Sequence, residues 1–134
     1  MGGKTPAQLY ALVFGIVLVL VGIIGFFVNA SFSVGAEVDR DQLLIFDVNG
    51  WHNVVHLVSG AIGLAMAGTP SSARLFALGF GVVYAVVFLL GLVMDPLLYL
   101  IPVNPADHVL HLLIAVIGIG AGIASPREPA PTTA

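Results

Sequence analysis

Four long apolar segments constrain the fold of this chain more than any other feature. They run from about Leu9 to Val28, Trp51 to Ala67, Leu75 to Val93 and Ala106 to Ala124. Each is close to the ~20 residues that cross a bilayer as a helix, and the second is the shortest. Apolar residues make up 59% of the chain and charged residues only 8%, against about 25% in a soluble domain. The pattern predicts an all-α integral membrane protein with four transmembrane helices, because helices satisfy their own backbone groups in lipid.

The basic residues predict the orientation of these helices. Lys4 precedes the first segment, Arg74 lies between the second and third, and Arg127 follows the fourth. Arg40 alone lies in the opposite set of loops, where acidic residues surround it. Because cytoplasmic loops are enriched in Lys and Arg, we expect both termini in the cytoplasm.

Composition also excludes several classes of function. The chain has no cysteine, which excludes disulfides, thiolate metal sites and a cysteine nucleophile. The net charge is −3 with only four basic residues, so nucleic acid is not an expected partner. No nucleophile has an adjacent base and no glycine-rich loop is suited to phosphate. Enzymatic activity is therefore uncertain, and the sequence favours a protein without it.

Two offsets align the chain with itself. Shifted by 66 residues, "LYALVFG" at 9–15 matches "LFALGFG" at 75–81. Shifted by 55 residues, "VNGWHNVVHL" at 48–57 matches "VNPADHVLHL" at 103–112. The second match contains polar residues, so it is not a chance similarity between apolar segments. The matches predict a helical hairpin used twice.

This duplication predicts the organisation of the whole chain. The repeat halves span about 9–67 and 75–124, and they point the same way through the membrane. Such parallel repeats are related by an axis along the membrane normal. We therefore expect one domain over residues 1–124, followed by a Pro-rich, disordered tail over 125–134.

Small residues follow the start of the second and fourth segments at helical spacing. Asn49 and Asn104 are suited to N-capping these two helices. Stripes of tiny residues mark close helix contacts in membranes, and we expect these two to press the second and fourth helices together. The two stripes are Gly60, Gly63 and Ala67 in one helix, and Ala115, Gly118 and Gly122 in the other.

All four histidines lie near the start of these same two helices. His52 and His56 are four residues apart, as are Asp107 and His111, so each pair shares a helix face. Ionisable groups at this depth in a membrane usually face the bundle interior. We expect these four side chains to converge in the outer leaflet, with Asn53 and His108 in a second layer that contacts them.

Three interpretations of this cluster remain open. In the first, hydrogen bonds among the side chains only lock helix packing, as in a structural or accessory subunit of a membrane complex. In the second, three imidazoles and one carboxylate bind zinc or another divalent metal. In the third, His56 and His111 are the axial ligands of a b-type haem, with Gly60 and Ala115 making room for its ring.

The polar motifs resemble those of a known family. "HNVVHLVSGAIGL" and "NPADHVLHLLIAVIGIG" are similar to a bacterial, largely actinobacterial, family of small four-helix membrane proteins, known only as a domain of unknown function. The resemblance covers about residues 9–124. It implies four helices in the inner membrane of a bacterium, and it implies no activity. Besides the lipid bilayer, a second copy of the chain or a larger membrane complex is a possible partner. The motif maps onto His52, Asn53, His56, Asn104, Asp107, His108 and His111.

Overall fold

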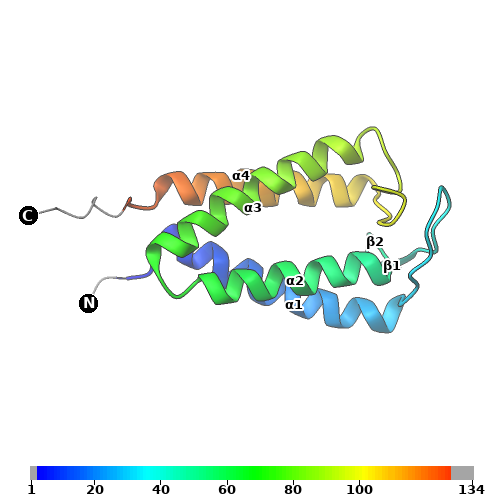
Figure 1. Cartoon of the computed structure of the whole chain (residues 1–134), viewed down its shortest axis with the longest axis horizontal. Helices are drawn as coiled ribbons and strands as arrows, with labels where there is room; N and C mark the ends of the chain where they lie inside the picture. Colours follow the sequence, from blue (N-terminus) through cyan, green and yellow to red (C-terminus); the bar gives the residue numbers. More distant parts are fainter. Residues whose placement is uncertain (1–2, 128–134) are drawn as a thin grey trace, which may run out of the picture.

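The computed structural model describes residues 3–127 as an arrangement of antiparallel helices (Figure 1). The start of α1 and the end of α4 lie at one end of the molecule, and a short β-hairpin lies at the other (Figure 1). The elements are α1 (Pro6–Val28), β1 (Asp41–Leu43), β2 (Phe46–Val48), α2 (Gly50–Met66), α3 (Pro70–Gly91) and α4 (Pro105–Ala124).

Each helix begins at a side chain that caps it. Thr5 and Thr69 accept hydrogen bonds from the first turns of α1 and α3. Asn49 caps α2 and Asn104 caps α4, as the sequence predicts. A proline follows the cap of α3, so this helix begins at Pro70. The sequence predicted a start near Leu75, because the first turn of α3 is polar and does not show in the pattern of apolar residues.

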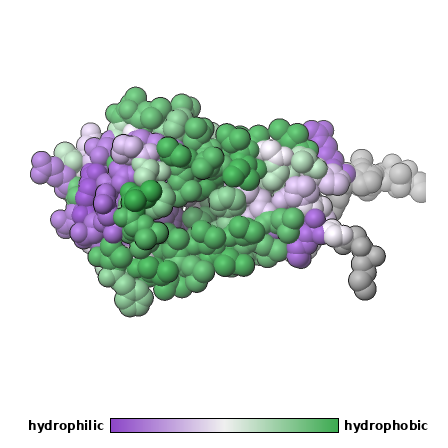
Figure 2. Space-filling view, turned by 180° about the vertical axis from the view of Figure 1, so that it is seen from behind, coloured by the Kyte–Doolittle hydropathy of each residue, from purple (hydrophilic) through white to green (hydrophobic). Residues whose placement is uncertain are grey.

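The apolar surface of the bundle fits lipid. Three helices, α1, α3 and α4, are long and apolar enough to cross a membrane. The fourth, α2, has only 17 residues. Figure 2 shows apolar side chains covering the middle of the molecule, with hydrophilic side chains gathered at the end that bears the hairpin. Leu20 of α1 and Val83 of α3 are more than half exposed on this surface, which no soluble domain would leave bare to water.

The helices pair within each half of the chain. Helix α1 packs along α2, and α3 packs along α4, while α1 also contacts α3 and α4. Within residues 3–127, α2 and α4 make no comparable contact. The prediction that their stripes of small residues press these two helices together is therefore wrong.

The glycines explain the observed pairing. A Cβ atom added to Gly60 would lie 2.7 Å from the carbonyl oxygen of Gly15 on α1. One added to Gly122 would meet the side chain of Leu78 on α3 at 2.5 Å. On α3, Gly81 likewise lies against the backbone of Ala115. Each stripe of small residues thus meets a small residue on the helix paired with it, α1 for α2 and α3 for α4. The backbones of the paired helices pack closely at these points.

The two halves of the chain meet differently at the two ends. Near the termini, a buried cluster that includes Ala11, Phe76, Ala77 and Ile114 forms the core. The Tyr10 hydroxyl also donates a hydrogen bond to the carbonyl oxygen of Ile114 at 3.0 Å. At the hairpin end the contacts between the halves are polar, and the candidate site lies there.

The start of the predicted tail is ordered. Ser125 is buried, and its hydroxyl accepts a hydrogen bond from the Ala7 backbone at 2.9 Å and donates one to the Ala121 carbonyl at 2.7 Å. This contact ties the end of α4 to the start of α1. Residues 128–134 of the predicted tail lie outside the described residues.

Candidate metal centre

Three of the predicted side chains come together at the hairpin end of the bundle. His52 from the first turn of α2 meets Asp107 and His111 from the first two turns of α4. One ligand atom from each residue lies within 4.8 Å of the others, and all three residues are buried. The side chains thus converge even though the helices that carry them do not pack closely together.

The ring of His52 is held in a defined orientation. Its Nδ1 lies 2.8 Å from the carbonyl oxygen of Asp47. A carbonyl only accepts hydrogen bonds, so Nδ1 carries the proton and Nε2 keeps a free lone pair. This arrangement, in which one ring nitrogen bonds to a carbonyl, is the usual way to orient a histidine that ligates a metal through the other nitrogen.

The two carboxylate oxygens of Asp107 have different surroundings. Oδ2 accepts hydrogen bonds from the backbone of Asn104 at 2.9 Å and of Asp47 at 3.1 Å. The first of these completes a capping box, because Asn104 Oδ1 accepts from the Asp107 backbone at 3.0 Å. No hydrogen bond from residues 3–127 reaches Oδ1. One oxygen therefore fixes the side chain and the other is left for a ligand.

His111 has a buried nitrogen without a partner. Its ring contacts Tyr84 edge to face, with 5.3 Å between centroids, and lies 6.2 Å from the ring of His52. Its Nδ1 has no hydrogen-bond partner in the described part of the chain. Unpaired buried polar atoms are rare in folded proteins, and this nitrogen is available to a ligand.

His56 lies beside the group of three but is not part of it. Its ring centroid is 4.4 Å from that of His52, one helical turn away. Like His111, it has a buried Nδ1 with no partner among residues 3–127. The four predicted ligands thus divide into three that converge and one, His56, that faces the adjoining space.

Asn53 and His108, predicted to support the ligands, have other contacts. The amide of Asn53 donates to the carbonyl of Asn29 at 2.8 Å, and its side chain lies against Gly25 of α1. The ring of His108 lies against Gly91 of α3. Each fills the notch left by a glycine on its hairpin neighbour.

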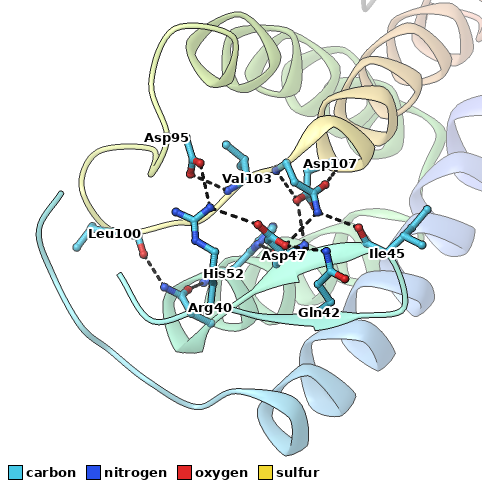
Figure 3. Close-up of polar contacts among 11 residues, drawn as sticks. Arg40, Gln42, Ile45, Asp47, His52, Asp95, Leu100, Val103 and Asp107 are labelled. Carbon is cyan, nitrogen blue, oxygen red and sulfur yellow. Dashed lines mark hydrogen bonds and ion pairs between the residues drawn. The ribbon is translucent and has the colours of Figure 1, made fainter. Parts of the chain in front are cut away.

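Asp47 connects the parts of this site. Figure 3 shows it between Arg40 and Asp107, with contacts to both. Its backbone N–H donates to Asp107 and its carbonyl accepts from His52, while its carboxylate accepts from Asn104 at 3.0 Å and from Arg40 at 3.3 Å. One residue of β2 thereby sets the positions of ligands on two different helices.

Arg40 closes the site toward the end of the bundle. Its guanidinium forms ion pairs with Asp47 at 3.3 Å and Asp95 at 2.9 Å. The hydrogen bond to Asp95, with further contributions from the charges of both carboxylates, raises the pKa of Arg40 above its usual range. A base with a raised pKa loses its stabilising charge only as the pH rises through that value, so Arg40 stays charged at neutral pH.

Comparison of the sequence with known protein families assigns this chain to a family. Residues 8–124 match the model of a domain of unknown function, DUF4383. The chain belongs to this family. A search of the curated proteins and of the solved structures found no match. The DUF4383 match confirms the resemblance seen in the two histidine motifs, and it carries no activity with it.

Sequence reasoning missed the central place of Asp47 in this DUF4383 member. Residues 46–49 read "FDVN" and residues 101–104 read "IPVN", so Asp47 stands where the second half has Pro102. An acidic residue at an unmatched position directly before a repeated motif was the available signal. It carries no helical periodicity, which is why the spacing of apolar and polar residues did not reveal it.

Proposed function

We propose that this protein is a four-span membrane protein, built from two tandem helical hairpins, that binds a divalent first-row metal ion. The ligands are His52, Asp107 and His111. The observation that carries the proposal is this buried group of three, in which Asp107 keeps a free oxygen and His111 a nitrogen with no partner. Two imidazoles and one carboxylate are a ligand set suited to zinc.

Matching contacts in the two halves support the tandem hairpins. The Asn49 amide donates to the carbonyl of Leu100 at 2.7 Å, and the Asn104 amide donates to that of Ile45 at 2.9 Å. Both donors and both acceptors are 55 residues apart. Such reciprocal bonds across the two halves are expected of a duplicated unit, and they favour α2 as a fourth span equivalent to α4.

The geometry favours a metal over a purely structural cluster. If the side chains only locked the helices together, their buried polar atoms would bond to one another. The Nδ1 atom of His111 has no such partner within residues 3–127. An unpaired buried polar group costs about 1–3 kcal/mol, and a bound group removes this cost.

The same geometry disfavours haem. Haem between His56 and His111 would need open space beside Gly60 and Ala115, and the backbone of Ala115 packs against Gly81 of α3 instead. Gly60, predicted to make room for a porphyrin, faces Gly15 and Val19 of α1 instead. A single ion fits the group of three, whose ligand atoms lie within 4.8 Å of one another. A metal with three protein ligands keeps one coordination position for a water or a substrate.

Metal analysis of purified protein tests this proposal. The chain is purified without a histidine tag, loaded with zinc, and compared with His111→Ala and His108→Ala. We expect one zinc per native chain and per His108→Ala chain, and its loss from His111→Ala. We also expect zinc to dissociate as the pH falls, because protons compete for the imidazole nitrogens.

His108→Ala is the matched control, since it removes a histidine of the same helix that packs against Gly91 and not among the ligands. Circular dichroism of each variant shows whether the helices are intact. Native protein without zinc, or equal zinc in both variants, would refute the metal proposal.

A further inference from the structure

Two apolar grooves flank the histidine cluster. One lies between α1 and α4 and has a volume of about 240 Å³; we call it the α1/α4 groove. The other lies between α2 and α3 and has a volume of about 190 Å³; we call it the α2/α3 groove. His111 lines both. Their rims include Val17 and Val83, which are 46% and 55% exposed, so both grooves open on the apolar side of the bundle.

The two grooves have equivalent walls. The residues from α1 and α3 are 66 positions apart, and pair as Phe14 with Phe80, Val17 with Val83, and Val21 with Val87. The residues from α4 and α2 are 55 positions apart, and pair as Leu110 with Val55 and Ile114 with Ser59. A β-turn covers each groove, with Leu43 and Phe46 over one and Leu98 and Ile101 over the other.

One pair of wall residues differs in a way that bears on a ligand. Tyr84 of the α2/α3 groove stands where the α1/α4 groove has Leu18. The phenol ring of Tyr84 packs edge to face on His111 at 5.3 Å. The α1/α4 groove lacks this ring and is the larger of the two. The chain thus places the phenol ring of Tyr84 beside a histidine in the α2/α3 groove, and a side chain without a ring or an oxygen, Leu18, at the equivalent position of the α1/α4 groove.

The inner wall of the α1/α4 groove is polar. His56, Asp107 and His111 line it, and all three are at most 7% exposed. The Nδ1 of His56 has no hydrogen-bond partner in the described residues. A ligand that enters from the apolar side therefore meets hydrocarbon first and the buried ring of His56 last.

We propose that the α1/α4 groove binds a lipid-soluble ring that carries a hydroxyl or carbonyl oxygen, of the phenol or quinone class, with this oxygen directed at His56. The volume is somewhat above the ~150 Å³ of an apolar cavity that takes benzene, which suits one substituted ring. A carboxylate or phosphate is disfavoured, because Asp107 lies at the same wall and a buried charge is costly. The proposal does not require a metal.

Photolabelling in liposomes tests it. The probe is an alkylphenol with a photoreactive diazirine in its chain, added to protein treated with EDTA. We expect labelled peptides from α1 and α4 at the groove. Unlabelled 4-pentylphenol should compete at concentrations about tenfold lower than pentylbenzene, since the latter lacks the hydrogen bond. 4-Pentylbenzoate should compete no better than pentylbenzene.

Two variants use the difference between the grooves. Leu18→Tyr puts into the α1/α4 groove the side chain that occupies the other one, and we expect it to abolish the labelling. Leu20→Tyr, on the lipid-exposed face of the same helix, is the matched control and should leave it unchanged. Tyr84→Leu should create a second labelled site on α2 and α3.

The competition experiment needs no variant, so a misfolded protein does not block the test. Labels spread evenly over lipid-facing residues, or equal competition by the phenol and the hydrocarbon, would overturn the proposal. Because EDTA is present throughout, success or failure here is independent of zinc binding, which is measured without the probe.

Discussion

At the scale of single residues, Asp107 combines two roles that are usually separate. As the third residue of α4 it completes a capping box through Oδ2, which is an ordinary structural function. The same oxygen accepts from the backbone of Asp47, so the carboxylate is fixed from two directions. These two hydrogen bonds hold the carboxylate in place and leave Oδ1 without a hydrogen bond from residues 3–127. A fixed ligand loses little entropy on binding a metal, which favours affinity.

Asp47 offers a residue-scale prediction. We expect Asp47→Ala to lower the free energy of unfolding by about 1–3 kcal/mol, because its carboxylate is the buried partner of Arg40 and Asn104. Asp41→Ala, at an exposed carboxylate that accepts from Asn29, should cost less than about 1 kcal/mol. Unfolding by titration with SDS measures both. Equal losses would contradict the central place given to Asp47.

At the scale of helices, the sequence predicted the local geometry of each helix well, but it predicted poorly which helices pack against each other. Two kinds of prediction depend only on spacing along one helix. They are the N-caps at Asn49 and Asn104, and the placement of His52 with His56 and of Asp107 with His111 on one helix face. A stripe of small residues also has a definite face, but it does not say which helix will meet it. Gly60 meets α1 because Gly15 lies opposite, and only the packed structure reveals that match.

Gly60 also gives the element-scale prediction. A Cβ there would lie 2.7 Å from the carbonyl oxygen of Gly15 and 2.8 Å from the backbone nitrogen of Val19, and neither backbone atom can move alone. We expect Gly60→Ala to destabilise the protein by about 1–3 kcal/mol, since α1 and α2 must separate.

Gly120→Ala is the control, because nothing lies within 4 Å of a Cβ at that position on α4. Its effect should be smaller than about 1 kcal/mol and of either sign. Thermal unfolding followed by circular dichroism compares the two variants. A neutral Gly60→Ala would show that the α1–α2 contact is looser than described.

At the scale of the whole molecule, polarity divides the bundle into two ends. The start of α1, the end of α4 and the turn between α2 and α3 lie at one end, and the β-hairpin lies at the other (Figure 1). Lys4, Arg74 and Arg127 belong to the first end, whereas Arg40 at the second is paired with Asp47 and Asp95. Among the described residues, basic side chains without an ion pair therefore gather at the first end, and from the positive-inside rule we expect this end in the cytoplasm.

Cysteine labelling tests this orientation and the number of spans together, since the chain has no cysteine of its own. Single cysteines are placed at Leu44 and Tyr99, which are 83% and 55% exposed at the hairpin end, and at the exposed Ser71 before the body of α3. We expect a membrane-impermeant maleimide to label Leu44→Cys and Tyr99→Cys in intact cells.

Ser71→Cys should react only after lysis, because reaching the cytoplasm after Leu44 requires α2 to cross the membrane despite its 17 residues. A helix of that length spans about 26 Å, a few ångströms short of a ~30 Å hydrocarbon core. Close packing on α1 and local thinning of the bilayer make up this difference at modest cost. Labelling of Ser71→Cys in intact cells alongside Leu44→Cys would instead leave α2 on the outer surface, and its equivalence to α4 would then fail.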